Sequence, residues 1–382
     1  MAVSATVVVA GAGLAGLAAA WELSRAGADV VLLDAERRPG GMVVTERPGG
    51  PGGPGGKDGF VVEGGPDGFL AAEPDIQELA RDAGIGGRLV DQLASGSSLW
   101  TGRRLEPLAE GQAAALLGIQ IPSDVRAQHE DVGAQHAAPL QFGFRSFATG
   151  MLDLVEALVA RLAPVFRPAQ GVAGLAPATR GWRLSLNGGS TVEAEAVILA
   201  LPAWAAARLV TGAGVPAARH LDDVIYYPST TVSLAYRSDQ LAAAPAGTGF
   251  VSAAEWGESG AAVRACSYSW LKYPGRAPPG HALIRAFVGP VDGDPAAAAH
   301  AELAGILGIR GSPLWSRAFT WPRGLPRYKP GHAGQVAAVR ERLTRLAPLA
   351  IAGAGFDGAG VSACVKSGRE AAREILHRLG QV

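Results

Sequence analysis

The stretch VVVAGAGLAG, residues 7–16, decides the fold of this chain. The apolar, β-branched run from Ala5 to Ala10 predicts a buried parallel strand, and Leu17 to Ala26 predicts a helix after the glycine turn. A second apolar run, Asp29–Leu33, completes a βαβ unit. Three glycines in a G-x-G-x-x-G pattern between a strand and a helix are typical of dinucleotide-binding folds.

Each glycine of this turn has a separate expected task. Gly11 permits the tight turn, Gly13 lets a pyrophosphate approach the backbone, and Gly16 lets the helix pack on the strand. A valine at Gly13 is expected both to exclude the pyrophosphate and to strain the turn. The helix N-terminus offers free N–H groups and partial positive charge to the phosphates. The alternative is a glycine-rich turn without a nucleotide.

The second strand ends at Asp34, 18 residues after Gly16. Its carboxylate is placed to accept hydrogen bonds from ribose hydroxyls, and its charge disfavours the 2′-phosphate of NADP. The residues of this unit that we expect to contact the cofactor are Gly11, Ala12, Gly13, Leu14, Ala15, Gly16, Asp34 and Ala35.

Composition excludes several classes of function. The 382 residues favour two interleaved domains, and 48% hydrophobic content supports a large core. The 34 basic and 34 acidic residues balance, which argues against nucleic acid or an anionic membrane as partner. Two cysteines and seven histidines show no metal-ligand spacing, so we expect no metal, no disulfide framework and a reducing compartment. Without a signal peptide or a long apolar run, we expect a cytoplasmic protein with weak or no membrane association.

The residues after Asp34 decide between NAD and FAD. Arg38 and the pair Gly40-Gly41 resemble the second sequence signature of the two-dinucleotide-binding flavoproteins. In that superfamily this signature accompanies FAD. Arg38 can pair with a phosphate through two N–H groups, and the glycines let the backbone pass close to the cofactor. The alternative for Arg38 is a solvated surface arginine.

Further segments narrow the resemblance to one family. Residues 63–69, Glu-Gly-Gly-Pro-Asp-Gly-Phe, are similar to the E-G-G-P-D-S-F segment of the protoporphyrinogen and coproporphyrinogen oxidases, which belong to the FAD-dependent amine oxidase superfamily. Residues 196–202, 273–281, 321–332 and 353–368 resemble four later motifs of that family. Together they cover both ends of the chain and most of its second half.

The resemblance implies a set of flavin contacts. Gly65, Pro66, Asp67 and Gly68 would line the flavin, the backbone of Val172 would meet the adenine side, and Trp321 would pack beside the isoalloxazine ring. Gly353, Ala359, Gly360 and Val361 would bring the N-terminus of the last helix to the pyrimidine end, where reduced flavin is anionic. Trp321 as an ordinary core residue remains the alternative. We expect Cys364 to be buried rather than linked to flavin, so that FAD is held non-covalently.

The predicted fold class is α/β, with a Rossmann-like FAD-binding domain interleaved with an α+β substrate domain. Residues 1–75, 146–215 and 326–382 would form the FAD-binding domain. Residues 76–145 would form a shortened helical substrate region, and residues 216–325 a β-sheet substrate domain. Outside the first βαβ unit, the expected strands are 45–47, 60–63, 182–186, 192–199, 231–237, 249–252, 263–270, 282–288 and 349–352. The expected helices are 75–83, 151–162 and 361–379.

The chain departs from the family pattern in three places. Residues 109–144 are too few for most of the helical region that lids the substrate pocket and meets the membrane in relatives. Ser97 stands where the family has an arginine that is associated with a substrate propionate, and Arg103, Arg104 or Arg145 could replace that charge or could be solvated surface arginines. Ala354 stands where the family has an Asp or Asn.

The resemblance therefore implies an FAD-dependent oxidase of porphyrin and heme biosynthesis. Hydride would pass from a porphyrinogen-like substrate to flavin N5, and oxygen would reoxidise the flavin. One alternative is an amine or small-molecule oxidase on the same scaffold, which the short region and Ser97 favour. The other is a non-catalytic flavoprotein that binds a tetrapyrrole.

Overall fold

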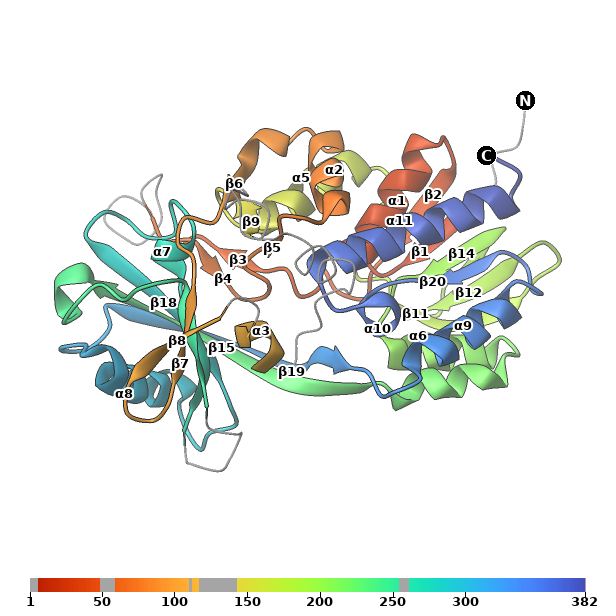
Figure 1. Cartoon of the computed structure of the whole chain (residues 1–382). Helices are drawn as coiled ribbons and strands as arrows, with labels where there is room; N and C mark the ends of the chain where they lie inside the picture. The colour runs from red at the N-terminus through yellow and green to blue at the C-terminus, as the bar shows by residue number, and fades with distance from the viewer. Residues whose placement is uncertain (1–5, 49–58, 110–111, 117–142, 254–260, 382) are drawn as a thin grey trace, which may run out of the picture.

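The computed structural model describes residues 6–48, 59–109, 112–116, 143–253 and 261–381, which fold around two large sheets (Figure 1). The glycine-rich loop at 49–56 and most of the short region at 109–144 lie outside the described residues. One sheet is parallel, with strand order β10-β2-β1-β14-β20. Its strands are β1 Thr6–Ala10, β2 Asp29–Leu33, β10 Phe166–Arg167, β14 Ala196–Leu199 and β20 Leu349–Ile351.

The parallel sheet is buried on both faces, as the unbroken apolar run of β1 predicts. Val7 and Val9 face a core shared with the helices α1 Leu14–Arg25, α2 Pro74–Asp82, α5 Leu152–Leu162 and α11 Val361–Arg378. Val8 and Ala10 face the opposite core. That side is covered by β11 Val172–Pro177, β12 Trp182–Leu186, β13 Thr191–Ala194, α6 Ala203–Gly212, η3 Pro216–Asp223 and α9 His332–Leu343.

The second sheet has seven strands in the order β19-β15-β18-β17-β16-β7-β8. It is antiparallel except where β16 pairs in parallel with β7. Its strands are β7 Ser97–Trp100, β8 Leu105–Leu108, β15 Ile225–Arg237, β16 Gly249–Ser252, β17 Val263–Tyr268, β18 His281–Val288 and β19 Trp315–Arg327. Helix α8, Pro295–Leu307, packs against one face of this sheet through Ala299 and Leu303.

Small elements connect the two halves. The hairpin β3 Thr45–Glu46 with β4 Val62–Glu63 follows the first βαβ unit, and a three-stranded sheet joins β5 Phe69–Leu70, β9 Phe144–Phe147 and β6 Leu89–Asp91. The remaining short elements are η1 Gly86–Arg88, α3 Gln112–Leu116, η4 Ser238–Gln240, α7 Ser269–Lys272 and α10 Ala354–Asp357.

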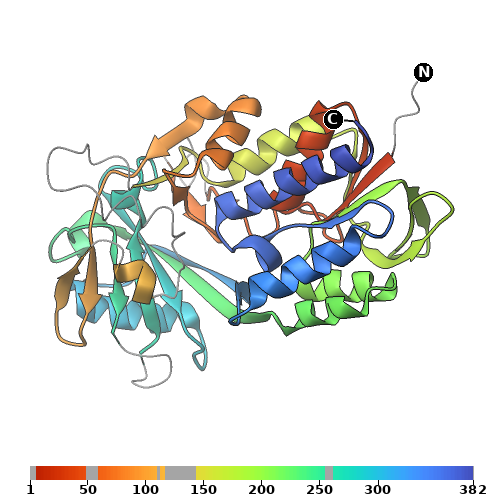
Figure 2. The ribbon, with the colours of Figure 1, turned by 45° about the vertical axis from the view of Figure 1, so that its right-hand side comes forward.

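The long strands β15 and β19 run from the second sheet to the nucleotide-binding half, as Figures 1 and 2 show. At their far end, the Tyr226 hydroxyl accepts a hydrogen bond from the Ala203 N–H at 2.9 Å. The Tyr328 hydroxyl, just after β19, donates to the carbonyl of Ala354. This two-stranded ribbon therefore fixes the second sheet against the loop that precedes the last helix.

The structure corrects several predicted elements. The strand expected at 192–199 is two strands, because β13 pairs with β12 while β14 enters the parallel sheet beside β1. The strand expected at 263–270 ends at Tyr268 and turns into α7. Helix α1 begins at Leu14, three residues early, because Gly13 is its N-cap. Within 76–145, β7 and β8 join the seven-stranded sheet instead of a helical region.

Candidate functional site

The glycine turn after β1 leaves open space at one position only. Gly11 has φ +104°, and a Cβ there would lie 2.2 Å from the Ala200 carbonyl oxygen. A Cβ on Gly16 would lie 1.7 Å from the oxygen of Gly11. Gly13 has φ −71° and no heavy atom within 4 Å of a built Cβ. The expectation that a side chain at Gly13 strains the turn is therefore wrong, because Gly13 borders free space of the kind a pyrophosphate needs.

Two segments that the sequence associated with the cofactor meet at this turn. The Asp34 carboxylate accepts a hydrogen bond from the Ala12 N–H at 2.6 Å, and the Gly40 N–H donates to the Ala12 carbonyl at 2.7 Å. A Cβ on Gly41 would lie 3.4 Å from the Cα of Gly13. The strand end and the glycine pair therefore close around the N-terminus of α1.

The Arg38 side chain stabilises the loop from Pro39 to Val43 through hydrogen bonds to its backbone. Its guanidinium donates to the carbonyls of Pro39 at 3.2 Å, Val43 at 2.9 Å and also Gly41. Three of its five N–H donors are thus engaged with the backbone that carries Gly40 and Gly41. In this structure the side chain fixes the loop, and pairing with a phosphate stays a prediction.

The start of β11 lies beside the end of β2. The Gln170 N–H donates to the Asp34 carbonyl at 2.6 Å, and a Cβ on Gly171 would lie 2.9 Å from the Cβ of Ala35. Val172 follows directly and is partly exposed. The predicted adenine-side residues Asp34, Ala35 and Val172 are therefore neighbours in space.

Helix α11 brings the end of the chain to the same place. Its N-cap is Gly360, and neither α11 nor α1 has a side-chain cap or an acidic residue in its first turn. Free N–H groups at two such N-termini suit an anionic ligand. Gly353 has φ +115° and lies with its Cβ position 3.6 Å from Ala15 of α1. Gly353 thus lies next to the glycine turn of α1, and Ala359, Gly360 and Val361 lead into α11 a few residues later.

A hydrogen-bonded chain fixes the loop before α11. The Gly353 N–H donates to the buried Ser367 hydroxyl at 2.8 Å, and Ser367 donates to Asp357 at 2.6 Å. Asp357 in turn forms an ion pair with Arg340 at 2.6 Å. Asp357 supplies a carboxylate three residues after Ala354, and that carboxylate is engaged within the protein.

The segment from Glu63 to Gly68 lies between the two halves of the molecule. A Cβ on Gly65 would lie 1.8 Å from the Met42 carbonyl oxygen, so the segment contacts the loop after Gly41. On its other side, Trp321 Nε1 of β19 donates to the Gly64 carbonyl at 2.9 Å. Trp321 therefore connects the second sheet to the segment expected to line the flavin, and it is only partly buried.

Five charged residues form a cluster at this segment, two of them within it, and most are shielded from solvent. They are Glu63, Asp67, Lys272, Arg276 and Arg285, each less than 10% exposed apart from the 19% exposed side chain of Asp67. Lys272 Nζ lies 3.0 Å from Asp67 Oδ2, and Arg276 Nη1 lies 3.5 Å from Glu63 Oε1. Arg276 also donates to Ser146 Oγ at 2.5 Å, and Arg285 donates to the Gly65 carbonyl.

The pKa values of the two carboxyl groups in this cluster shift in opposite directions, although burial acts to raise both. Burial raises the pKa of Glu63, and the nearby charge of Arg276 and the hydrogen bond from Thr45 offset only part of that effect. Burial also acts to raise the pKa of Asp67, but the charges of Lys272 and Arg285 outweigh it and lower the pKa to about 2. Asp67 is therefore ionised across the physiological range.

Sequence patterns did not indicate that the three cations of this cluster, Lys272, Arg276 and Arg285, lie at the candidate site. One signal was present, because Arg285 is the single charged residue inside the apolar run Ala282–Val288. A charge in the middle of a central strand is rarely buried without a purpose in the site.

The structure separates the two arginines that were predicted to bind substrate. Arg104 lies in the turn between β7 and β8, pairs with Glu106 at 2.8 Å and has a 78% exposed side chain, and Arg103 is exposed in the same turn. Arg145 of β9 pairs with Asp91 at 2.6 Å and Gln77, and its carbonyl lies against Gly68. Only Arg145 is thus near the segment expected to line the flavin.

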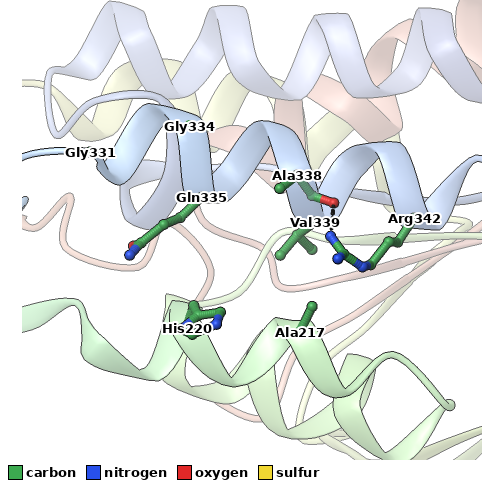
Figure 3. A pocket seen from close by; sticks show the side chains of 8 residues that line it. All are labelled: Ala217, His220, Gly331, Gly334, Gln335, Ala338, Val339 and Arg342. Carbon is green, nitrogen blue, oxygen red and sulfur yellow. Dashed lines mark hydrogen bonds between the residues drawn. The ribbon is translucent and has the colours of Figure 1, made fainter.

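Elsewhere among the described residues, neither a cavity nor the arrangement of possible metal ligands indicates a second site. A cavity of about 380 Å³ lies between η3 and α9, lined by His220, Gln335 and Arg342 among others (Figure 3). None of its lining residues belongs to the glycine turn or to the segments expected to contact the cofactor. Across the described residues, no group of three His, Cys, Asp or Glu side chains is arranged for a metal ion. Among the helices that the structure describes, none is long and apolar enough to cross a membrane.

Two uncapped helix N-termini at a glycine turn over a parallel sheet are typical of a dinucleotide-binding fold. Residues 9–83 match the NAD(P)-binding Rossmann-like domain, and residues 87–376 match the family described as flavin containing amine oxidoreductase. The chain belongs to the flavin containing amine oxidoreductase family, and it is an FAD-dependent oxidoreductase.

Relatives narrow the comparison. A coproporphyrinogen III oxidase of Bacillus subtilis (strain 168) is 24% identical over 473 aligned positions, covering 97% of each chain. A coproporphyrinogen III oxidase of Propionibacterium freudenreichii subsp. freudenreichii is 26% identical and covers 97% of this chain and 90% of its own. These matches confirm the family resemblance. An alignment longer than the 382 residues of this chain also shows that the Bacillus relative carries insertions that this chain lacks.

Solved structures share the fold. A putative protoporphyrinogen oxidase from Exiguobacterium sp. 255-15 superposes with a TM-score of 0.78 at 24% identity and covers both chains in full. Cyclohexylamine oxidase from Brevibacterium oxydans IH-35A gives 0.74 at 15% identity, covering 99% of this chain and 100% of its own. These similarities confirm the predicted α/β fold with a Rossmann-like domain.

Proposed function

We propose that this chain is a porphyrinogen oxidase of porphyrin and heme biosynthesis, which holds FAD non-covalently and uses oxygen as electron acceptor. The observation that carries the proposal is the Glu63–Gly68 segment. It is bonded to the second sheet through Trp321 and packed on the nucleotide-binding loop through Met42. Its sequence resembles the flavin-lining motif of the porphyrinogen oxidases, and relatives that match along nearly the whole chain carry that name.

The residues present fit FAD, because free helix N-termini and the open space beside Gly13 suit its pyrophosphate. The pyrophosphate would lie at the free space beside Gly13, and the adenosine would lie toward Asp34, Ala35 and Val172. The flavin would lie between the N-terminus of α11 and the Gly65–Gly68 segment. Bound FAD would supply the hydride acceptor, because the ring takes a hydride at N5 and returns two electrons to oxygen. The chain itself supplies position, exclusion of water and positive potential.

We further propose a division of labour along the chain. Residues 1–75, 146–215 and 326–382 form the FAD-binding domain. Residues 216–325 form the substrate domain together with β7 and β8 from the 76–145 segment, since those strands extend the same sheet. Arg145 is the better of the two predicted arginines for a substrate carboxylate, because it lies on β9 beside Gly68.

An amine or other small-molecule oxidase is the second candidate. Ser97 is half-buried, and its hydroxyl lies 3.4 Å from the Thr248 hydroxyl, so it offers no charge to a propionate at the usual anchor position. A smaller or uncharged substrate would not need that charge.

Anaerobic mixing of the FAD-loaded protein with coproporphyrinogen III tests the proposal. Bleaching of the flavin absorbance, followed by recovery and peroxide formation when oxygen is admitted, is the expected result. Bleaching by primary amines alone would establish the second candidate. Coproporphyrinogen III that binds without bleaching the flavin, together with no bleaching by amines, would contradict both oxidase assignments.

A further inference from the structure

The cluster of five charged residues at the Glu63–Gly68 segment contains more positive than negative groups. Lys272, Arg276 and Arg285 contribute three positive charges, and Glu63 and Asp67 contribute two negative ones. Arg145, which lies beside Gly68, does not change this count because it is paired with Asp91 at 2.6 Å. Within the part of the chain that the structure describes, one buried positive charge therefore has no matching carboxylate. Such a charge is costly unless an anion is present for part of the protein's working cycle.

Arg285 is the cation without an ion pair. Lys272 pairs with Asp67 and Arg276 pairs with Glu63, whereas Arg285 has no carboxylate oxygen within 4.0 Å among the described residues. It is 4% exposed, and its Nε lacks a hydrogen-bond partner there. Its one hydrogen bond to the backbone runs from Nη2 to the carbonyl of Gly65.

The position of Arg285 defines how it can act. It lies on β18, in the middle of the seven-stranded sheet, and reaches across to a segment 220 residues away in the chain. Because the guanidinium is enclosed by protein, it cannot touch a ligand directly. It can fix the Gly65 peptide and contribute an electrostatic field through a region of low dielectric constant.

We propose that Arg285 is a positioning residue that gives the flavin site its preference for an anionic flavin ring, by holding Gly65 and supplying the uncompensated charge. This inference rests on the proposed placement of FAD along Gly65–Gly68. Reduced flavin carries negative charge at N1 and C2=O, which matches the sign and the count of the unpaired charge. The helix N-terminus of α11 and Arg285 then act on the same ring from two different elements.

Sulfite binding measures this preference without any substrate. The sulfur lone pair of sulfite forms a bond to N5 of oxidised flavin, and the displaced electron pair places negative charge at N1 and C2=O. Removing a positive charge should therefore weaken sulfite binding, and removing a negative charge should strengthen it. Titration of the flavin absorbance with sulfite at fixed ionic strength gives the dissociation constant, and the reduction potential of the bound flavin gives a second readout.

Three substitutions give a signed pattern. Arg285→Gln should weaken sulfite binding by about tenfold, because it removes one unit of positive charge from a region of low dielectric constant beside the flavin site. Asp67→Asn should strengthen sulfite binding, because it frees the charge of Lys272. Arg285→Lys keeps the positive charge but loses the planar guanidinium that donates to the Gly65 carbonyl. It should retain most of the sulfite affinity if the charge contributes more than that hydrogen bond. Arg317→Gln is the matched control, since Arg317 lies on the same sheet, 54% exposed and paired with Glu46.

The outcomes separate this inference from the proposed function. Failure of the parent protein to bind FAD would overturn the proposed function. Bound FAD with equal sulfite affinity in the parent and in Arg285→Gln would overturn the role of Arg285 and leave the function intact. If Arg285→Gln does not fold, Lys272→Met removes a charge from the less enclosed edge of the cluster and must weaken sulfite binding. A loss of affinity in both Arg285→Gln and Asp67→Asn would indicate structural damage and contradict the charge effect.

Discussion

Gly368 of helix α11 packs directly on Ala15 of helix α1, near opposite ends of the sequence. A Cβ on Gly368 would lie 2.0 Å from the carbonyl oxygen of Ala15 and 3.0 Å from its Cα. The two helices therefore cross at backbone contact, which brings both of their N-termini to the same edge of the parallel sheet. The cofactor site depends on this contact because it needs both helix ends together.

Gly368→Ala should lower both stability and FAD affinity. The methyl group cannot fit without moving a backbone, and overpacking of this kind costs about 1–3 kcal/mol. Gly305→Ala is the control, because Gly305 lies inside helix α8 with no heavy atom within 4 Å of a built Cβ. That change should raise stability by about 0.5–1 kcal/mol. Urea unfolding and FAD titration measure both effects, and equal stability of the two variants would refute the contact argument.

Gly13→Val should abolish FAD binding while the flavin-free protein stays folded. The side chain would fill the free space beside the α1 N-terminus, and the loss of a good N-cap costs only about 1 kcal/mol. Gly16→Ala should instead unfold the turn, because its Cβ would lie 1.7 Å from the Gly11 oxygen. Circular dichroism with flavin content of the purified proteins distinguishes the two. Normal FAD content in folded Gly13→Val would place the nucleotide elsewhere.

Acid precipitation should release all of the flavin into the supernatant. Burial raises the pKa of the Cys364 thiol to about 12, and its Sγ faces the Gly358 carbonyl at 3.8 Å, so it is a poor nucleophile. Burial also raises the pKa of Cys266. Cys364 is only partly buried, contrary to expectation, so with its raised pKa it should react slowly with a thiol reagent near pH 8, whereas the buried Cys266 should react only after unfolding. Flavin retained in the pellet, and lost from it in Cys364→Ala, would disprove non-covalent binding.

The Asp67–Lys272 pair should contribute stability that is lost in acid. The folded-state pKa of Asp67 is lowered from 3.8 to about 2, so the contribution is complete above the unfolded value and disappears as pH falls through the folded one. Asp67→Asn should lower the free energy of unfolding by about 2 kcal/mol above about pH 5. The difference from the parent should vanish between about pH 4 and pH 2. Glu106→Gln, in an exposed pair, should show little change, and a pH-independent effect of Asp67→Asn would refute the linkage.

Substrate affinity should depend on Arg145 and not on Arg104. Arg145 lies beside Gly68, whereas Arg104 is in an exposed turn with Glu106. Arg145→Gln should raise the KM for coproporphyrinogen III by about tenfold or more, since hydrogen bonds to a charged group contribute roughly 1.5–3 kcal/mol. Arg104→Gln should leave KM unchanged. Steady-state oxygen consumption measures both, and the reverse ranking would place the substrate carboxylates near the β7–β8 turn.

The sequence alone predicted the parts of the molecule that depend on local patterns. The β1–turn–α1 unit, the position of Asp34 and the helix at 361–379 follow from hydrophobic periodicity and glycine spacing, which act over a few residues. The same reasoning failed for Val192–Leu199, because an alternating pattern that contains Glu193 and Glu195 runs directly into an apolar one, and the two strands pair in different sheets. It also missed β19, whose Pro322 and Pro326 argue against a strand in the middle of a sheet but are tolerated at its edge.

By itself, the sequence determined the fold class, the family and the dinucleotide signature, because each of these depends on short motifs of neighbouring residues. The tertiary structure alone decided that Arg38 braces its own loop, that Arg104 is remote from Gly68, and that Arg285 reaches Gly65 from a strand 220 residues away. Charge pairing depends on which distant residues share a region of low dielectric constant, and no local pattern records that.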